Sequence, residues 1–241
     1  MRRSRLAAAG LAVAVGLGAG TATAGSAFAA GTVTTRDTRA TPILDALRSR
    51  CGQAVDTRVT ALTAAGSLLA QVKAVTADHR SALSSVLTGD STALQTLKTK
   101  MQSDPDLAAL TADCRSVFTD YRVFALVLPR TRLVAAADIS GAVADRLSSV
   151  ADALDAAIAK AGSAGRDTAA AKADLAAMRA KIDAGRTAAA GVAGQILGLT
   201  SADWNANHDV LAPARQSLRT ARADLVAARD LGRKVVADLR A

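Results

Sequence analysis

Apolar and small residues recur at alternating steps of three and four along most of this chain, and this spacing restricts the fold more than any other feature. Such steps place side chains on one side of an α-helix, as in helices that pack lengthwise on one another. The longest unbroken series, called a seam below, is Ala171, Leu175, Met178, Ile182, Gly185, Ala189, Val192, Ile196 and Leu199. The sequence therefore predicts an all-α fold with coiled-coil-like packing.

The same spacing predicts a series of helices joined by short turns. We expect one helix or two in line over residues 41–86, a short helix over 91–101 and another from about 105 to 118. Longer helices follow over residues 133–161, 166–199 and 211–239, with turns at 89–91 and 162–165. Long helices with short connections are typical of an elongated up-and-down bundle. We predict one helical domain over residues 41–241, with possible halves at 41–129 and 130–241.

The N-terminal residues have the pattern of an export signal. Arg2, Arg3 and Arg5 precede an apolar stretch, and the small residues after it end in an A-x-A site at Ala29. The stretch is shorter than the roughly 20 residues that a membrane span needs. We predict cleavage after Ala29, a flexible N-terminus over residues 30–40, and a secreted, extracellular protein with no transmembrane segment after cleavage. Association with the cell wall is left open. The paired arginines leave both the general and the twin-arginine export routes open.

Cys51 and Cys114 are the only cysteines. In an exported chain an even count favours a disulfide over metal ligands or a nucleophile. If the two cysteines faced each other across a hairpin turning at Gly89, one arm would be longer by about 20 Å. The disulfide therefore requires a break near residues 76–78 or an extended stretch at residues 103–105.

The chain is basic, with a formal net charge of +9, and signal cleavage would remove three arginines and no acidic residue. The last helix carries a basic stripe beside its seam, formed by Arg215, Arg219, Arg222, Arg229 and Arg233. Such arginines either cover apolar surface and pair with acids on a neighbouring helix, or form a docking face for an anionic cell-envelope polymer, lipid headgroups or an acidic protein partner. The acids available for pairing are Asp167, Asp174 and Asp183. Nucleic acid is not an expected partner, because no aromatic residues interleave with the stripe.

The connection over residues 203–209 (DWNANHD) concentrates polar residues around the single tryptophan, Trp204. Its D-x-N-x-N start resembles a calcium loop, but His208 stands at the position of the loop glycine and Ala214 at that of the bidentate glutamate. We expect these side chains to cap backbone amides and Trp204 to close the end of the bundle. Cation binding is the alternative.

Three aromatic residues follow Cys114 at steps of three: Phe118, Tyr121 and Phe124. We expect them to form core around the disulfide, or else to line an apolar-ligand pocket beside a kink at Pro129. Arg58 and His79 fall on the seam of the first helix, where polar residues usually set register. We predict no catalytic, metal or cofactor residues, and an enzyme would need Asp138, His208 or Tyr121 to converge on one cleft.

Residues 121–138 (YRVFALVLPRTRLVAAAD), together with the export signal and the alanine-rich helices, resemble small secreted helical proteins of actinobacteria to which no activity is assigned. This resemblance implies a helical fold and transfers no functional residue. We expect a non-enzymatic protein that acts through its surface, as a cell-envelope-associated or scaffolding protein. The alternative is a carrier of lipid or a small apolar ligand. The seams can close within one chain or between chains, so the oligomeric state stays open.

Overall fold

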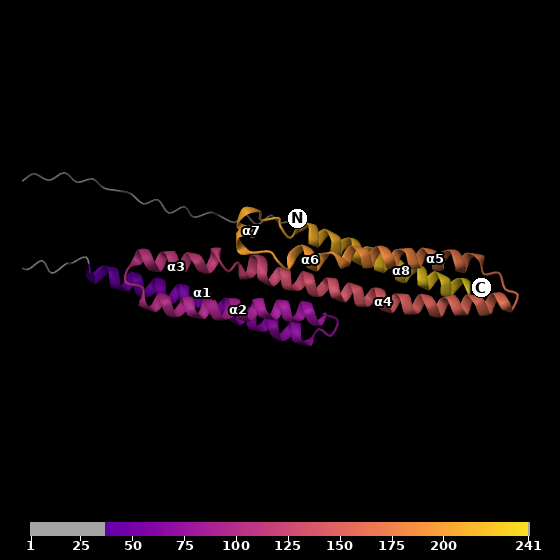
Figure 1. Ribbon diagram of the computed structural model, residues 1–241, viewed down its shortest axis with the longest axis horizontal. Coiled ribbons are helices and arrows are strands. Elements are labelled where there is room, and N and C mark those ends of the chain that lie inside the picture. The colour runs from indigo at the N-terminus through magenta and orange to yellow at the C-terminus, as the bar shows by residue number, and fades with distance from the viewer. Residues whose placement is uncertain (1–36, 241) are drawn as a thin grey trace, which may run out of the picture. The chain divides into compact units, whose positions relative to one another are not determined.

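The computed structural model describes residues 37–240, with side chains from Pro42 onward, and these residues form helices with no strand among them (Figure 1). The predicted all-α fold is therefore confirmed. The predicted export signal at residues 1–29, and residues 30–36 of the predicted flexible segment, lie outside the described part of the chain. The first described helix begins at Asp37, four residues before Thr41, where the sequence pattern placed its start.

Two antiparallel helices open the described chain: α1 (Asp37–Gln71) and α2 (Ala77–Ser103). The turn between them is held by the guanidinium group of Arg80, which donates hydrogen bonds to three carbonyl oxygens at the end of α1 and in the turn. The side chain of Thr76 accepts a hydrogen bond from the amide of His79 and so caps α2. The predicted turn at residues 89–91 is wrong, because these capping contacts end the hairpin earlier and Gly89 lies inside α2.

The predicted disulfide is confirmed. Cys51 of α1 is bonded to Cys114 of α3 (Leu107–Thr119), with a Cα–Cα distance of 5.6 Å. The break that the geometry of the two cysteines required occurs at residues 72–76. A second turn over residues 104–106 leads into α3, whose first turn is capped by Asp106 through a hydrogen bond of 2.8 Å from the amide of Ala109. The bridge therefore joins α1 to α3 across the end of α2 rather than linking the two arms of one hairpin.

The chain then enters its longest helix through a π-helical turn. Arg122 adopts a left-handed backbone conformation (φ 45°), and η1 (Val123–Val127) continues into α4 (Leu128–Ser163). Pro129 lies in the first turn of α4, a position at which proline is common because its φ suits a helix. The apolar run before Pro129 is therefore helical rather than extended.

The remaining helices return along α4 and then reverse. They are α5 (Ala169–Ala190), α6 (Val192–Ile196), α7 (Ser201–Ala206) and α8 (Ala212–Asp238). The first part of α4 packs with α1, α2 and α6, and its later part packs with α5 and α8 (Figure 1). The predicted turn at residues 162–165 is confirmed, and Gly165 has φ +80°, which explains the glycine there.

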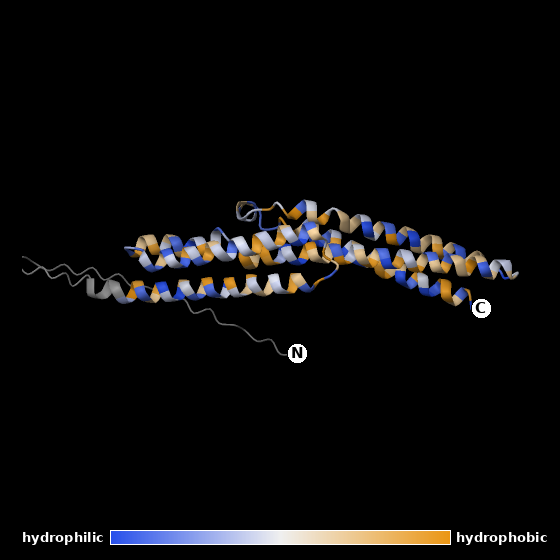
Figure 2. Ribbon diagram, turned by 60° about the horizontal axis from the view of Figure 1, so that its bottom comes forward, coloured by the Kyte–Doolittle hydropathy of each residue, from blue (hydrophilic) through white to orange (hydrophobic). Residues whose placement is uncertain are grey.

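The long seam over residues 171–199 has the predicted register but is interrupted at Gly191, between α5 and α6. From Ala171 to Ile196 all of its members are buried. Figure 2 shows apolar residues recurring between polar ones along the helices. Steps of three and four from Arg58 predict Leu68 on the seam of the first helix. This prediction is wrong, because Leu68 is 64% exposed while its neighbour Leu69 is buried.

Candidate functional site

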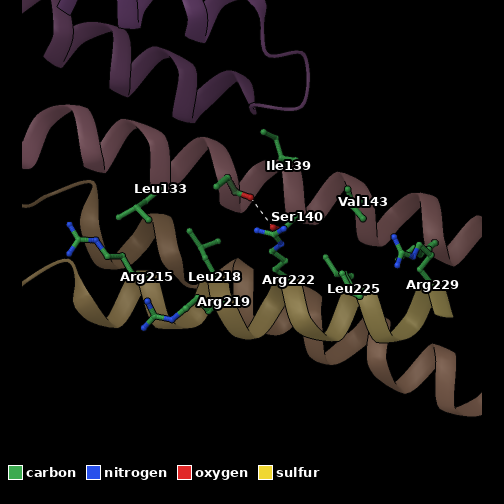
Figure 3. A pocket seen from close by; sticks show the side chains of 13 residues that line it. Leu133, Ile139, Ser140, Val143, Arg215, Leu218, Arg219, Arg222, Leu225 and Arg229 are labelled. Atoms are coloured by element: carbon green, nitrogen blue, oxygen red, sulfur yellow. Dashed lines mark hydrogen bonds between the residues drawn. The ribbon is translucent and has the colours of Figure 1, made fainter. Parts of the chain in front are cut away.

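A groove lies between α4 and α8, with a volume of about 630 Å³, and is called the α4/α8 groove below (Figure 3). Its lining is apolar apart from Ser140 and a set of arginines from α8. None of the described residues that line it is acidic. The residues from α4 are Leu133, Ala136, Ile139, Ser140, Val143 and Leu147, and those from α8 are Arg215, Leu218, Arg219, Arg222, Leu225, Val226 and Arg229.

The α4 side of the groove follows steps of three and four from Leu133 to Leu147, so the sequence predicts it as part of a seam that packs on another helix. A second stripe on α4, which includes Val134, Ala137 and Ala144, is buried instead. The seam residues facing the groove are partly exposed, and the exposed fraction of Val143 is 37%. Leu133 and Leu147 at the two ends of this wall pack partly against buried core residues, whereas Ile139 and Val143 between them are left open to solvent.

The α8 side alternates charged and apolar residues at the same steps of three and four. Leu225 is buried, because it packs against the close approach of α5 at Gly185. The arginines are exposed, and Figure 3 shows Arg215, Arg222 and Arg229 following one another along this wall of the groove. Three guanidinium groups spaced by seven residues therefore stand beside an apolar floor.

The predicted pairing of this stripe with aspartates of a neighbouring helix is wrong. Asp183 pairs with Arg186 at 3.1 Å, and Asp167 accepts a hydrogen bond from the amide of Ala169. The contacts of the stripe are local to α8: Arg219 binds Gln216, while Arg229 and Arg233 bind Asp230. Within residues 37–240, Arg215 and Arg222 form no ion pair. The positive charge along the groove is therefore not neutralised by another helix.

Four of the five predicted docking arginines, Arg215, Arg219, Arg222 and Arg229, line the groove, whereas Arg233 lies outside it. The sequence predicted Val143 and its heptad neighbours on α4 only as part of a packing seam and assigned them to no site. What was not visible in the sequence is that Ile139 and Val143 stay exposed beside α8.

A second groove of about 520 Å³ lies between α1 and α4 and shares Ala136 and Ile139 with the first. The prediction that the three aromatic residues after Cys114 form core is wrong for Phe118 and Phe124, whereas Tyr121 packs partly buried against the core. Phe118 and Phe124 are each about half exposed, and the guanidinium of Arg58 lies over both rings, 4.2 Å and 5.4 Å from their centroids. Arg58 thus covers aromatic faces through cation–π contacts, and partial burial lowers its pKa.

A polar recess surrounds Arg130, at the junction of α2, α4 and α6. Arg130 is 5% exposed and donates hydrogen bonds to the carbonyl oxygens of Leu197 and Leu199, which fix the end of α6. Asp90 and Tyr121 line the same recess. Burial raises the pKa of Asp90, opposed by Arg130, and burial together with the charge of Asp90 raises the pKa of Tyr121. The contacts of Arg130 anchor the connection between α6 and α7.

The three residues that an enzyme would have required on one cleft lie at separate places. Asp138 binds the imidazole of His79 at 2.9 Å and the amide of Thr76 at 3.0 Å. Tyr121 lies at the polar recess, and His208 stacks against Trp204 with ring centroids 5.6 Å apart. His79 therefore links α2 to α4.

Asp203 and Asn207 form caps, as the sequence indicated, whereas Asn205 donates a hydrogen bond to the carbonyl oxygen of Thr119 and accepts one from Arg122. Thr200 and Asp203 make a reciprocal capping box at the start of α7, and the side chain of Asn207 accepts a hydrogen bond from the amide of Asp209. Trp204 is partly buried and packs against the hydrophobic core that α1, α2, α3 and the start of α4 share. The described residues contain no group of three or more histidine, cysteine or acidic side chains placed to hold a metal ion.

Searches against protein-family models, curated proteins and solved structures found no match. None of the helices in residues 37–240 combines the length and hydropathy that a membrane span requires. The assignment of a function therefore depends on the geometry of the α4/α8 groove.

Proposed function

We propose that this chain is a secreted, non-enzymatic interaction protein that associates with an anionic component of the cell envelope through the α4/α8 groove. One observation carries the proposal. Arg215, Arg222 and Arg229 repeat at one heptad position beside an apolar floor, and no acidic residue lines the groove. Secretion is supported by the signal-like N-terminus and by the disulfide, which is stable in oxidising compartments.

The groove combines two attractions that suit an amphiphilic anion. Contiguous exposed apolar surface is unfavourable in water and is commonly a binding surface. Exposed arginines attract anions over about one Debye length, roughly 8–10 Å at physiological salt. A partner that presents acidic groups beside an apolar side would satisfy both walls at once. The non-enzymatic part of the proposal is supported by the separation of Asp138, His208 and Tyr121.

Sedimentation with isolated cell envelopes tests this proposal. The mature protein should sediment with envelopes at low salt and be released at high salt, because salt screens exposed charges. Triple charge reversal at Arg215, Arg222 and Arg229 should abolish sedimentation. The matched control reverses Arg146, Arg166 and Arg233, which are exposed and lie outside the groove. Wild-type protein that stays in the supernatant at low salt, or equal losses in both triple variants, would contradict the proposal.

A lipid or apolar-ligand carrier is the second candidate. It is favoured by the two neighbouring apolar grooves that share Ile139. Native mass spectrometry of protein purified from culture medium, and flotation with anionic vesicles, test it. The absence of both bound lipid and vesicle binding would count heavily against a carrier.

A further inference from the structure

We propose that the occupant of the α4/α8 groove is an acidic amphipathic α-helix of a partner protein, which packs lengthwise against α4 and α8. This inference rests on the proposed function and names the chemistry of its partner. It follows from three properties of the groove: the spacing of its walls, its length and its charge.

Both walls follow the spacing that a packed helix requires. The α4 wall and the α8 wall each advance by three, four, three and four residues, from Leu133 to Leu147 and from Arg215 to Arg229. Side chains at these steps form the holes that receive knobs from a lengthwise helix. The spacing of the walls therefore matches a helix, whereas an acyl chain has no such repeat to match.

The length of the groove suits about four turns of helix. Each wall covers fourteen residue steps, which is about 21 Å at 1.5 Å per residue. The helices α4, α5 and α8 already pack on one another. A helix in the groove would cover Ile139, Val143 and Val226, which are now between 37% and 42% exposed. The added helix would thus bury apolar residues of α4 that are now exposed to solvent.

The charge of the groove determines the sign of the partner. Arg215, Arg222 and Arg229 occupy one heptad position, and glutamates or aspartates spaced by seven residues on the incoming helix would lie along them. A basic helix would meet the arginines with no acidic lining residue to compensate. A second copy of this chain docked groove to groove would bring no acidic residue to these arginines, because none lines the groove, and the chain as a whole is basic, with a formal net charge of +9. The partner is therefore a different, acidic chain.

A designed peptide tests the proposal directly. The probe has three heptads with leucine and isoleucine at the a and d positions and glutamate at the flanking positions. Two control peptides are used: one with lysine in place of glutamate, and one that keeps the composition but scrambles the apolar spacing. Binding to the full mature protein is followed by fluorescence anisotropy, and helix formation in the peptide by circular dichroism. We expect the acidic probe alone to bind and to gain helicity.

Variants of the protein locate the binding. Arg222→Glu and Val143→Asp should each weaken binding of the acidic probe about tenfold or more. Arg233→Glu makes the same charge change on the same helix outside the groove and should leave the affinity unchanged. The far-ultraviolet spectrum and melting temperature of each variant establish that it is folded. Equal binding of the scrambled peptide, or an equal loss in Arg233→Glu, would overturn the proposal.

Protease treatment of envelopes separates this inference from the proposed function. If the partner is a protein helix, protease digestion of the envelopes should abolish sedimentation of the wild-type protein. Sedimentation that persists after digestion, with no binding of the probe, would overturn the acidic helix and leave the association with anionic envelope standing. The absence of sedimentation with untreated envelopes would overturn the proposed function itself.

Discussion

Replacing Gly185 by alanine should show how closely α5 and α8 approach each other. Gly185 is buried on α5, and a Cβ added there would lie 2.9 Å from Cγ of Leu225 and 3.2 Å from the carbonyl oxygen of Ala221 on α8. Both distances are shorter than ordinary van der Waals contact. The backbone oxygen cannot move without moving α8, so the substitution forces either a shift of the helix or a rearrangement of Leu225.

Two opposing contributions determine how much Gly185→Ala changes the free energy of unfolding. Alanine is favoured over glycine in a helix interior by about 1 kcal/mol. Overpacking of a well-packed core costs about 1–3 kcal/mol. The free energy of unfolding should therefore fall by about 0–2 kcal/mol in Gly185→Ala. Gly89, inside α2, supplies a matched control, because a Cβ there would have nothing within 4 Å. Gly89→Ala should stabilise the protein by about 1 kcal/mol.

The comparison of the two variants isolates the contact, since the gain in helix propensity is common to both. Gly185→Ala should be less stable than Gly89→Ala by about 1–3 kcal/mol, measured from urea unfolding midpoints at constant slope. For a chain of this size the difference corresponds to roughly 2–12 °C in melting temperature. If Gly185→Ala proved at least as stable as Gly89→Ala, the close contact of α5 with Leu225 and Ala221 would be refuted.

Three further predictions concern other contacts. Replacement of both cysteines by alanine should lower the free energy of unfolding by about 4 kcal/mol in the chain-entropy account, because the bridge closes a separation of 63 residues; urea titration with and without reductant checks this. Asp138→Ala should cost about 1–3 kcal/mol by the same assay, since the largely buried carboxylate binds both His79 and the amide of Thr76, and an unchanged midpoint would contradict this role. Hydrogen bonds from the side chain and amide of Thr200 lower the pKa of Asp203. The folded-state pKa is then the lower one, so this contribution is complete above about pH 4 and is lost as the pH falls through the folded-state pKa. The stability of the wild type over Asp203→Asn should shrink in acid, and a pH-independent difference would refute the role of the capping box.

Much of the fold could be predicted because helix formation and its buried stripe depend on neighbouring residues. The steps from Ala171 to Ile196 identified the buried side of α5 and α6 correctly, and the cysteine count identified the disulfide. The position of the first hairpin could not be predicted in the same way. Gly89 is tolerated inside an exposed stretch of helix, whereas the real turn is held by Arg80 reaching back to the end of α1.

For the candidate site, the sequence by itself determined the arginine stripe and the seam of α4, since each is a local repeat of three and four residues. Only the tertiary structure decided that the first half of this seam remains open and that Arg215 and Arg222 find no acidic partner within the described residues. The physical reason is that a heptad pattern specifies which side of a helix can pack. Which neighbour packs there depends on the path of the whole chain. Here α6 packs on the first part of the buried stripe of α4 and α5 on its later part, while Ile139 and Val143 on the groove side stay exposed.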